Sequence, residues 1–294
     1  MRQGVALSVF SSFLFALLYY YATVLHPLSG ASIFAWRVVL ALPLVALLIT
    51  RGRDWSSVHA VLVRLRSEPL LVAALLVCGA LIGVQLLLFV WAPLHGYGLD
   101  VSLGYFLLPL VMVVVGRLVY GERLTPWQKA AVFMAAIGVG HEVLRVGSVS
   151  WPTAVVALGY PPYFMLRRRL RLSSLVGLWF DMLLLLPVAL WLLYSETPGV
   201  VAQFTDRPLL WVLVPLLGVI SSVALLCYLI ASRRLPLGLF GVLSYVEPVL
   251  LFWVAFLLLG EPVTLRAWFT YVPIWVAVLL LVCEGVLALR RGSR

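Results

Sequence analysis

Long uninterrupted runs of apolar residues dominate the chain, and short segments between them hold nearly all of its charges. Each run has roughly 18 to 25 residues, the length that a helix needs to cross about 30 Å of hydrocarbon. Only helices or closed barrels satisfy every backbone group in lipid, and runs this long and apolar form helices. The pattern predicts an all-α polytopic membrane protein with ten spans, at 4–25, 30–50, 69–92, 98–120, 126–144, 150–167, 173–194, 208–232, 236–260 and 264–289.

Composition and charge agree with a membrane protein. Of the 294 residues, 64% are hydrophobic and 11% are charged, whereas soluble domains average about 25% charged residues. When the N-terminus is placed inside, only Arg145, Arg207 and Arg266 of the 21 basic residues fall on the outer side, and Arg37 lies within a span. The positive-inside rule then predicts that both termini are cytoplasmic. The net charge of +10 is therefore expected to meet anionic lipid headgroups and not nucleic acid.

A short signature, P-x11-G-E-x-x-T, occurs twice, 139 positions apart. Its copies comprise Pro109, Gly121, Glu122 and Thr125, and then Pro248, Gly260, Glu261 and Thr264. They end the fourth and ninth spans, so the two halves enter the membrane with opposite orientation. We therefore expect two inverted five-helix repeats, at 4–144 and 150–289. Secondary transporters often follow this plan, with the substrate near the midplane where the repeats meet.

The repeated spacing of the signature also suggests what its residues do. Pro109 and Pro248 lie near the bilayer centre, where a proline bends a helix, and we expect two kinks that shape a cleft between the halves. Kinks that only improve packing are the alternative. Thr125 precedes a proline and is expected to cap the next helix. Glu122 and Glu261 are interpreted as residues beside the positive end of the helix that follows each of them.

Ionisable side chains inside a membrane are costly unless they are paired or hydrated, so each is a candidate for function. Glu247, next to Pro248, can take up and release a proton during transport, or it forms a permanent ion pair. Arg37 can hold a carboxylate or phosphate through its planar fork, or it pairs with Glu247 or Asp181. Gln85 either lines the cavity or bonds between helices. Asp181 is expected to be structural, because the basic segment 167–171 is within reach.

The remaining tyrosines, cysteines and histidines give weaker evidence about function. Tyr105 and Tyr245 lie beside the prolines and are expected to line the cavity. The three cysteines fall inside spans without metal-ligand spacing, and the four histidines are expected in or near loops. They are Cys78, Cys227 and Cys283, and His26, His59, His95 and His141. We expect no catalytic residue, no metal and no cofactor, and an intramembrane enzyme is the less favoured alternative because paired metal-binding carboxylates and nucleophile sets are missing from the sequence.

Two blocks carry a family resemblance. The S-L-G-Y-F block at 102–106, followed by Pro109, and the R-R-L-P-L block at 233–237, followed by Tyr245 and Pro248, are similar to the RarD type of the EamA-domain drug/metabolite transporters. Arg37 and Tyr163 also match, and the similarity covers nearly the whole chain. The resemblance implies a ten-helix transporter of the bacterial inner membrane, often an exporter of small metabolites or drugs.

The chain departs from this family at several polar positions. The family usually has Asn where this chain has Leu108 and Met112, and a shorter Asp181 replaces a Glu. Asn-Trp is replaced by Gln85-Leu86, and a Glu and a His are replaced by Ser32 and Trp36. These changes favour a less polar substrate, and they keep open a second function, a flippase for lipids or lipid carriers with the same fold. The partners expected are a small-molecule substrate and membrane lipids, and a homodimer is left open.

Overall fold

The computed structural model describes residues 2–94, 97–147, 150–197, 199–257 and 265–291. Within these ranges the chain is helical and contains no strand. The helices are α1 (Arg2–Val24), α2 (Gly30–Arg51), α3 (Trp55–Ser67), α4 (Pro69–Leu94), α5 (Gly98–Tyr120), α6 (Pro126–Val146), α7 (Trp151–Leu170), α8 (Ser174–Ser195), α9 (Val200–Asp206), α10 (Leu210–Arg234), α11 (Leu237–Leu243), α12 (Val246–Leu257) and α13 (Leu265–Arg291).

Six helical stretches of the described chain, within α1, α2, α4, α5, α8 and α10, are long and apolar enough to cross a membrane. Their outer faces carry many exposed large apolar side chains, which a protein in water would bury and which lipid solvates. The protein is therefore a polytopic membrane protein. The helices α6 and α7 also have about the length of a span, but they carry more charge, including the arginines in the last turn of α7.

Two short helices and one break were not predicted from the sequence. The helix α3 follows α2 and buries Val58 and Val61 one turn apart, and α9 precedes α10. The expected continuous span at 236–260 is divided into α11 and α12, with a turn at Ser244 and Tyr245. Pro248 explains the break, since it has no N–H to donate to the carbonyl of Ser244. That carbonyl accepts instead from the N–H of Glu247, at 3.2 Å.

The first copy of the repeated signature forms a tight turn between α5 and α6. Gly121 ends α5 with a φ of 61°, the left-handed conformation that glycine adopts without strain. Thr125 then forms a capping box with Gln128 and begins α6 at Pro126, as predicted. In the second copy, Gly260, Glu261 and Thr264 lie outside the described residues.

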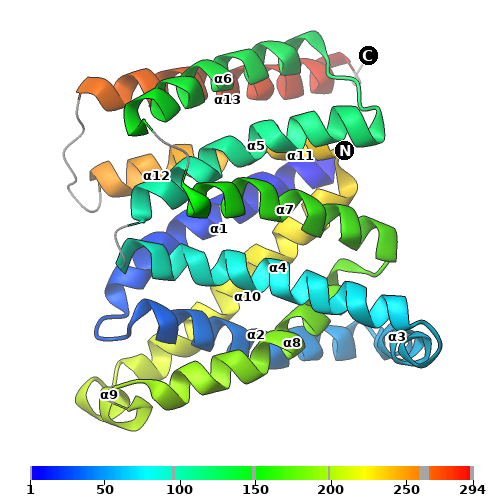
Figure 1. The fold of residues 1–294 in the computed structure, drawn as a ribbon, viewed down its shortest axis with the longest axis vertical. Coiled ribbons are helices and arrows are strands. Elements are labelled where there is room, and N and C mark those ends of the chain that lie inside the picture. The colour runs from blue at the N-terminus through cyan, green and yellow to red at the C-terminus, as the bar shows by residue number, and fades with distance from the viewer. Residues whose placement is uncertain (1, 95–96, 148–149, 198, 258–264, 292–294) are drawn as a thin grey trace.

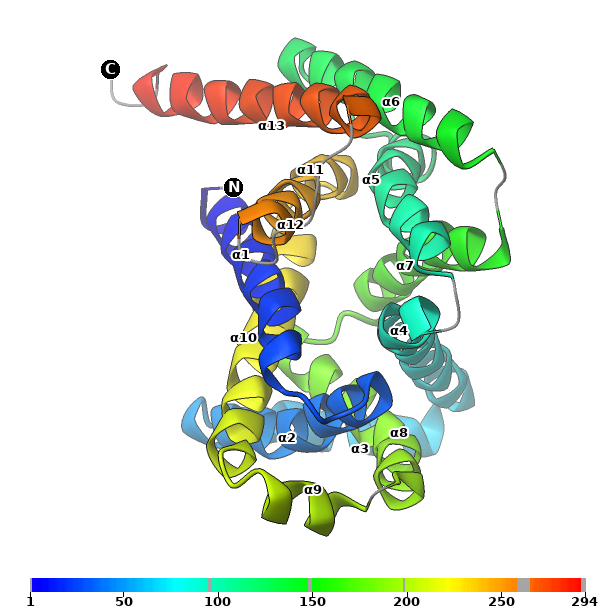
Figure 2. The ribbon, with the colours of Figure 1, turned by 90° about the vertical axis from the view of Figure 1, so that its left-hand side faces the viewer.

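The helices are arranged around a ring in which elements far apart in the sequence pack together (Figure 2). The pair α6 and α13 lies at one end of the long axis, and α2 and α8 lie toward the other, as Figure 1 also shows. Between them α1 packs on α10, α4 and α5 pack on α7, and α11 packs on α5. The largest buried cluster, with Phe34, Met112, Tyr163 and Phe240 among its members, runs through most of these helices.

One end of the helices collects much of the positive charge, and we call it the basic end. It is defined by the turn at 121–125, the last turn of α7 with Arg167 to Arg169, and the turn between α10 and α11 with Arg233 and Arg234. Arg168 donates to carbonyls at the end of α10 and in the turn that follows it, and Glu122 accepts from the first residue of α11, which brings these three segments together. The helix α1 begins and α13 ends on this side of the bundle, where α3 also lies (Figure 1).

Candidate functional site

Arg37 lies deep in the bundle on α2, which begins after Ser29. The side chain of Ser29 accepts from the backbone N–H of Ser32 and so caps the helix. The Nε of Arg37 donates to the hydroxyl of Ser221 on α10, at 2.7 Å. Although protein surrounds it, the side chain of Arg37 is partly exposed, as expected for a residue that lines an internal space. Ser221 orients the guanidinium without neutralising its charge.

Glu247 lies across from Arg37, in the first turn of α12 directly after the helix break. The two side chains interact electrostatically, and each is partly exposed. Among the described residues neither forms an ion pair at contact distance, so the permanent pair that the sequence left as an alternative is absent from this conformation. The two groups therefore lie near each other inside the bundle without direct contact.

Three tyrosines surround these charges. Tyr105 on α5 and Tyr160 on α7 have ring centroids 6.3 Å apart, and both lie near Arg37 and Glu247. Tyr228 on α10 interacts with Glu247 and with Tyr160, and its ring packs 4.8 Å from that of Phe240. Tyr160 and Tyr228 were not nominated from the sequence, because aromatic residues within spans are common and mostly pack in the core.

A narrow cavity adjoins Arg37 between α2, α4, α8 and α10. Its walls are apolar apart from Arg37 and two serines, and it has room for about one water molecule. It is lined by Phe34, Arg37, Val38, Ala41, Leu86, Leu178, Met182, Ser221, Ser222 and Leu225. The space beside Arg37 is thus nearly closed in this conformation.

Two of the nominated residues make structural hydrogen bonds. Gln85 is 1% exposed, and its amide donates to the carbonyl of Val155 on α7, at 2.8 Å. Gly159 permits this approach, because an added Cβ there would lie 2.2 Å from the Gln85 nitrogen. Tyr245 is fully buried, and its hydroxyl donates to the carbonyl of Phe106 on α5, at 2.9 Å.

The two prolines occupy different places in their helices. The helix α5 continues through Pro109, whereas Pro248 is the third residue of α12, just after the break. The expected pair of kinks is therefore one proline inside a helix and one at a helix start. The family departures Leu108 and Met112 are 3% and 0% exposed, so they pack in the core and do not line open space.

Asp181 forms a separate buried cluster with Arg167 and Tyr163. The hydroxyl of Tyr163 donates to Oδ2 of Asp181, at 2.8 Å, and Asp181 and Arg167 interact electrostatically. Arg167 is 4% exposed and donates to the carbonyl of Ser174, at 3.2 Å. Gly177 makes room for it, since an added Cβ would overlap the guanidinium. Arg167, in the basic segment at the end of α7, thus lies near Asp181, as the sequence suggested.

A second repeat signature was missed from the sequence. Ser29, Arg37 and Pro43 of the first half correspond to Ser173, Asp181 and Pro187, each 144 positions later. Both serines cap their helices through the side chain, and both charged residues stand eight positions after the cap. A search at the single offset of 139 could not find this match, because the loops of the two halves differ in length.

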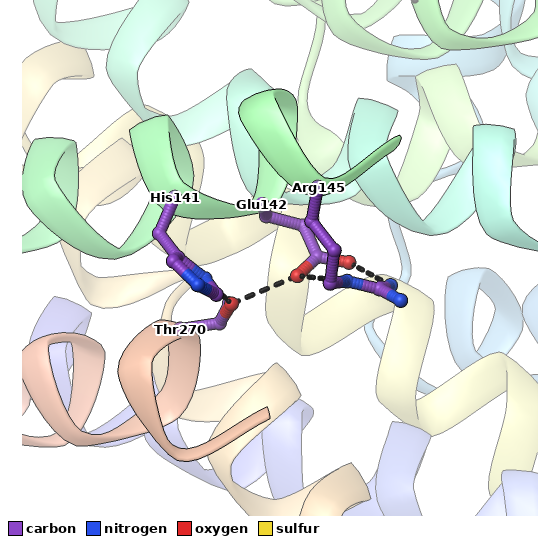
Figure 3. Close-up of polar contacts among 4 residues, drawn as sticks. All are labelled: His141, Glu142, Arg145 and Thr270. Atoms are coloured by element: carbon purple, nitrogen blue, oxygen red, sulfur yellow. Dashed lines mark hydrogen bonds and ion pairs between the residues drawn. The ribbon is translucent and has the colours of Figure 1, made fainter. Parts of the chain in front are cut away.

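A polar network joins α6 to α13 far from Arg37 (Figure 3). Thr270 donates to Oε2 of Glu142, at 2.8 Å, and lies 2.9 Å from Nδ1 of His141. Arg145 completes the network with an ion pair to Glu142. His141, expected in or near a loop, lies inside α6. Among the described residues no group of His, Cys, Asp and Glu is arranged to hold a metal.

Comparisons with known proteins extend over the whole chain. A protein of Pseudomonas aeruginosa named "Chloramphenicol-sensitive protein RarD" is 49% identical over 99% of this chain and 97% of its own length. An "Uncharacterized transporter" of Haemophilus influenzae is 37% identical over 97% of this chain and 95% of its own. "Protein RarD" of Escherichia coli is 29% identical over 100% of this chain and 98% of its own.

The fold is also shared with a solved structure. A crystal structure at 18% identity covers 94% of this chain and 96% of its own, with a TM-score of 0.66. No family model matches the chain.

Proposed function

Because this chain belongs to the RarD family of membrane transporters, we propose that it is a secondary active transporter that moves small metabolites or drug-like compounds across the bacterial inner membrane. In this proposal ten spans form two inverted five-helix repeats, both termini are cytoplasmic, and the substrate passes between the repeats. Export is the proposed direction. The relatives are named as transporters and not as enzymes.

The packing of the helices supports the inverted repeat. When each helix is exchanged with its counterpart in the other half, the observed neighbours map onto one another. In this exchange α1 corresponds to α7, α4 to α10, and α5 to the divided helix formed by α11 and α12. The contact of α1 with α10 then becomes that of α7 with α4, and the contact of α5 with α7 becomes that of α12 with α1. The pairs α2 with α8, α5 with α11, and α6 with α13 map onto themselves. Such an exchange is what a two-fold relation between the halves produces.

Tyr245 and Phe106 support a position for the axis of this proposed relation. They are 139 positions apart, the same offset as the repeated signature, so they are counterparts that hydrogen-bond to each other. Counterparts related by a two-fold axis meet only near that axis. In this proposal the axis therefore passes between α5 and the start of α12, beside Tyr105 and Glu247.

The observation that carries the function is the arrangement of Arg37 and Glu247. They are opposite charges that face one internal region, remain partly exposed, and have no ion-pair partner among the described residues. Tyr105 and Tyr160 lie near Arg37, and the narrow cavity beside Arg37 has apolar walls apart from Arg37, Ser221 and Ser222. Arg37 would hold an anionic or polar group of the substrate, and the aromatic rings would hold its apolar body. Gln85 and Tyr245 would support these walls from behind.

We propose that Glu247 couples transport to protons, because it is an acidic group in this region that can bind and release a proton without breaking an ion pair. Purified protein in liposomes tests this. Counterflow of a solute panel that includes chloramphenicol and polar amino acids would identify substrates, and a pH gradient would then drive accumulation.

The expected result is that liposomes with the wild-type protein accumulate a substrate when a pH gradient is imposed across their membrane. The Glu247→Gln variant should exchange the substrate in counterflow but fail to accumulate it. An Asp206→Asn variant, which changes an exposed acid at the end of α9, is the matched control and should behave as wild type. Gradient-driven accumulation by Glu247→Gln would refute proton coupling, and absence of counterflow for every solute in wild type would refute the transporter for this panel.

A further inference from the structure

We propose that Glu122 is a gating residue, whose carboxylate holds the start of α11 and keeps the basic end closed between the two halves. The inference rests on the proposed function, because a gate matters to a protein that alternates its access. It differs from the interpretation of the sequence alone, in which Glu122 lies beside the next helix, α6.

The carboxylate of Glu122 binds the other half of the molecule. Its Oε1 accepts from the backbone N–H of Leu237, at 2.6 Å, and its Oε2 accepts from that of Gly238, at 2.8 Å. These N–H groups open α11, where no partner within the helix exists. A carboxylate that accepts two such bonds at the positive end of a helix makes a strong, directional contact.

The backbone around Glu122 is shaped for this contact. The left-handed turn at Gly121 directs the chain back toward α11. Gly116 then leaves room for the carboxylate, because an added Cβ would lie 2.6 Å from Oε2 and 2.8 Å from the Gly238 nitrogen. Arg117 donates to the carbonyl of Glu122, at 3.2 Å, and steadies the turn. Gly116, Arg117 and Gly121 thus shape the turn and the space in which the Glu122 carboxylate lies.

Arg168 holds the turn that precedes the two N–H groups that Glu122 binds. Its Nη2 donates to the carbonyls of Ser232 and Leu235, at 2.7 and 2.6 Å, and so holds the turn between α10 and α11. Its Nη1 also lies 3.9 Å from Oε1 of Glu122. Arg168 belongs to the second half and moves with that turn. Rocking of the halves would therefore leave the Arg168 bonds intact and break those of Glu122.

The position of this contact suits a gate. Contacts near the axis, such as that of Tyr245 with Phe106, move little when two halves rotate, whereas contacts at the rim must break. Glu122 is partly exposed, and at the membrane surface water can replace its partners when the contact opens. The contact of Glu122 with α11 thus holds the basic end closed in one state, and it can open with a small loss of free energy because water replaces its hydrogen bonds.

Cysteine accessibility tests the gate without any substrate. Val113 on α5 is 8% exposed and lies beside Gly238, so a Val113→Cys reporter becomes reactive only when α5 and α11 separate. The reporter is placed in a chain with Cys78, Cys227 and Cys283 replaced by Ala. An impermeant maleimide is then applied to inside-out and right-side-out vesicles.

Two variants break the contact in different ways, and each has a matched control. Glu122→Gln loses one acceptor and the charge, and Gly116→Ala displaces the carboxylate. We expect each to raise the labelling rate from the side of the basic loops about tenfold, as the loss of a charged hydrogen bond implies. Glu68→Gln removes an exposed carboxylate, and Gly140→Ala adds a Cβ with no atom within 4 Å. Both should label as wild type.

The outcomes separate this inference from the proposed function. Glu122→Asp keeps the charge and should label at a rate between wild type and Glu122→Gln, which a merely structural role would not produce. Unchanged labelling in both Glu122→Gln and Gly116→Ala overturns the gate, even if liposomes transport normally. Increased labelling together with no transport of any solute would refute the proposed function and leave the contact as a conformational lock.

Discussion

Replacing Asp181 by alanine should destabilise the protein far more than the loss of one side chain suggests. Asp181 is fully buried and Arg167 is 4% exposed, and the two interact electrostatically although no nitrogen and oxygen of the pair lie within 4 Å of each other. Tyr163 donates to the same carboxylate. The Asp181→Ala variant leaves a buried guanidinium without its counter-charge and a buried hydroxyl without its acceptor.

The magnitude follows from what is left behind. Removal of one partner of a buried ion pair costs about 3–5 kcal/mol, because the other charge stays desolvated. The loss of Asp181 should approach this range, since Arg167 is buried near it, although not in direct contact. Arg167 cannot relax toward α8, since Gly177 already lies in contact with it. Replacement of both charges by apolar residues of similar size is often nearly neutral. The double variant Asp181→Leu with Arg167→Met should therefore regain most of the lost stability.

A double-mutant cycle measures this directly. Unfolding in detergent micelles would be followed by circular dichroism during SDS titration, for wild type, both single variants and the double variant. We expect a coupling free energy of about 2 kcal/mol or more between the two sites, and almost no effect of Asp206→Ala at an exposed site. Additive effects of the two substitutions would refute the compensation of Arg167 by Asp181.

Further predictions concern the helix contacts. Tyr245→Phe removes the bond to Phe106 and should cost about 1 kcal/mol, read in the same SDS titration; no loss would mean that the hydroxyl has another role. Gly138→Ala should cost about 1–3 kcal/mol, because its Cβ would lie 2.5 Å from the carbonyl of Thr270. Gly140→Ala on the same helix meets no atom and should be neutral; equal stability of the two variants would contradict this packing of α6 on α13.

Six of the expected spans could be predicted, because the requirement for apolar length is a property of each segment alone. The short helix α3 was missed because its apolar residues, such as Val58 and Val61, recur at helical spacing without forming a long run. The break before α12 was expected as a kink at Pro248. A proline shows that a hydrogen bond is lost, but the neighbours decide whether the helix bends or stops.

The sequence predicts that a side chain lies within a helical span, but it does not predict the direction in which that side chain points. Arg37, Gln85 and Glu247 were nominated by depth, and only Arg37 and Glu247 are partly exposed in the bundle interior. Gln85 points from α4 to a carbonyl of α7. Which face of a helix meets which neighbour depends on the packing of all helices. The amphipathic pattern that would reveal it is weak when nearly every residue is apolar.

Two positions that match in the sequence, Arg37 and Asp181, have different surroundings, and Gly177 accounts for part of the difference. Arg37 and Asp181 stand eight residues after equivalent caps, yet only Asp181 has a buried counter-charge. One turn before Asp181, Gly177 lets Arg167 lie against α8. One turn before Arg37 stands Ile33, whose branched side chain would exclude such a neighbour. Arg167 thus lies near Asp181, whereas Arg37 has no opposite charge at ion-pair distance among the described residues. This difference agrees with the proposal that Arg37 holds a substrate and that Asp181 is structural.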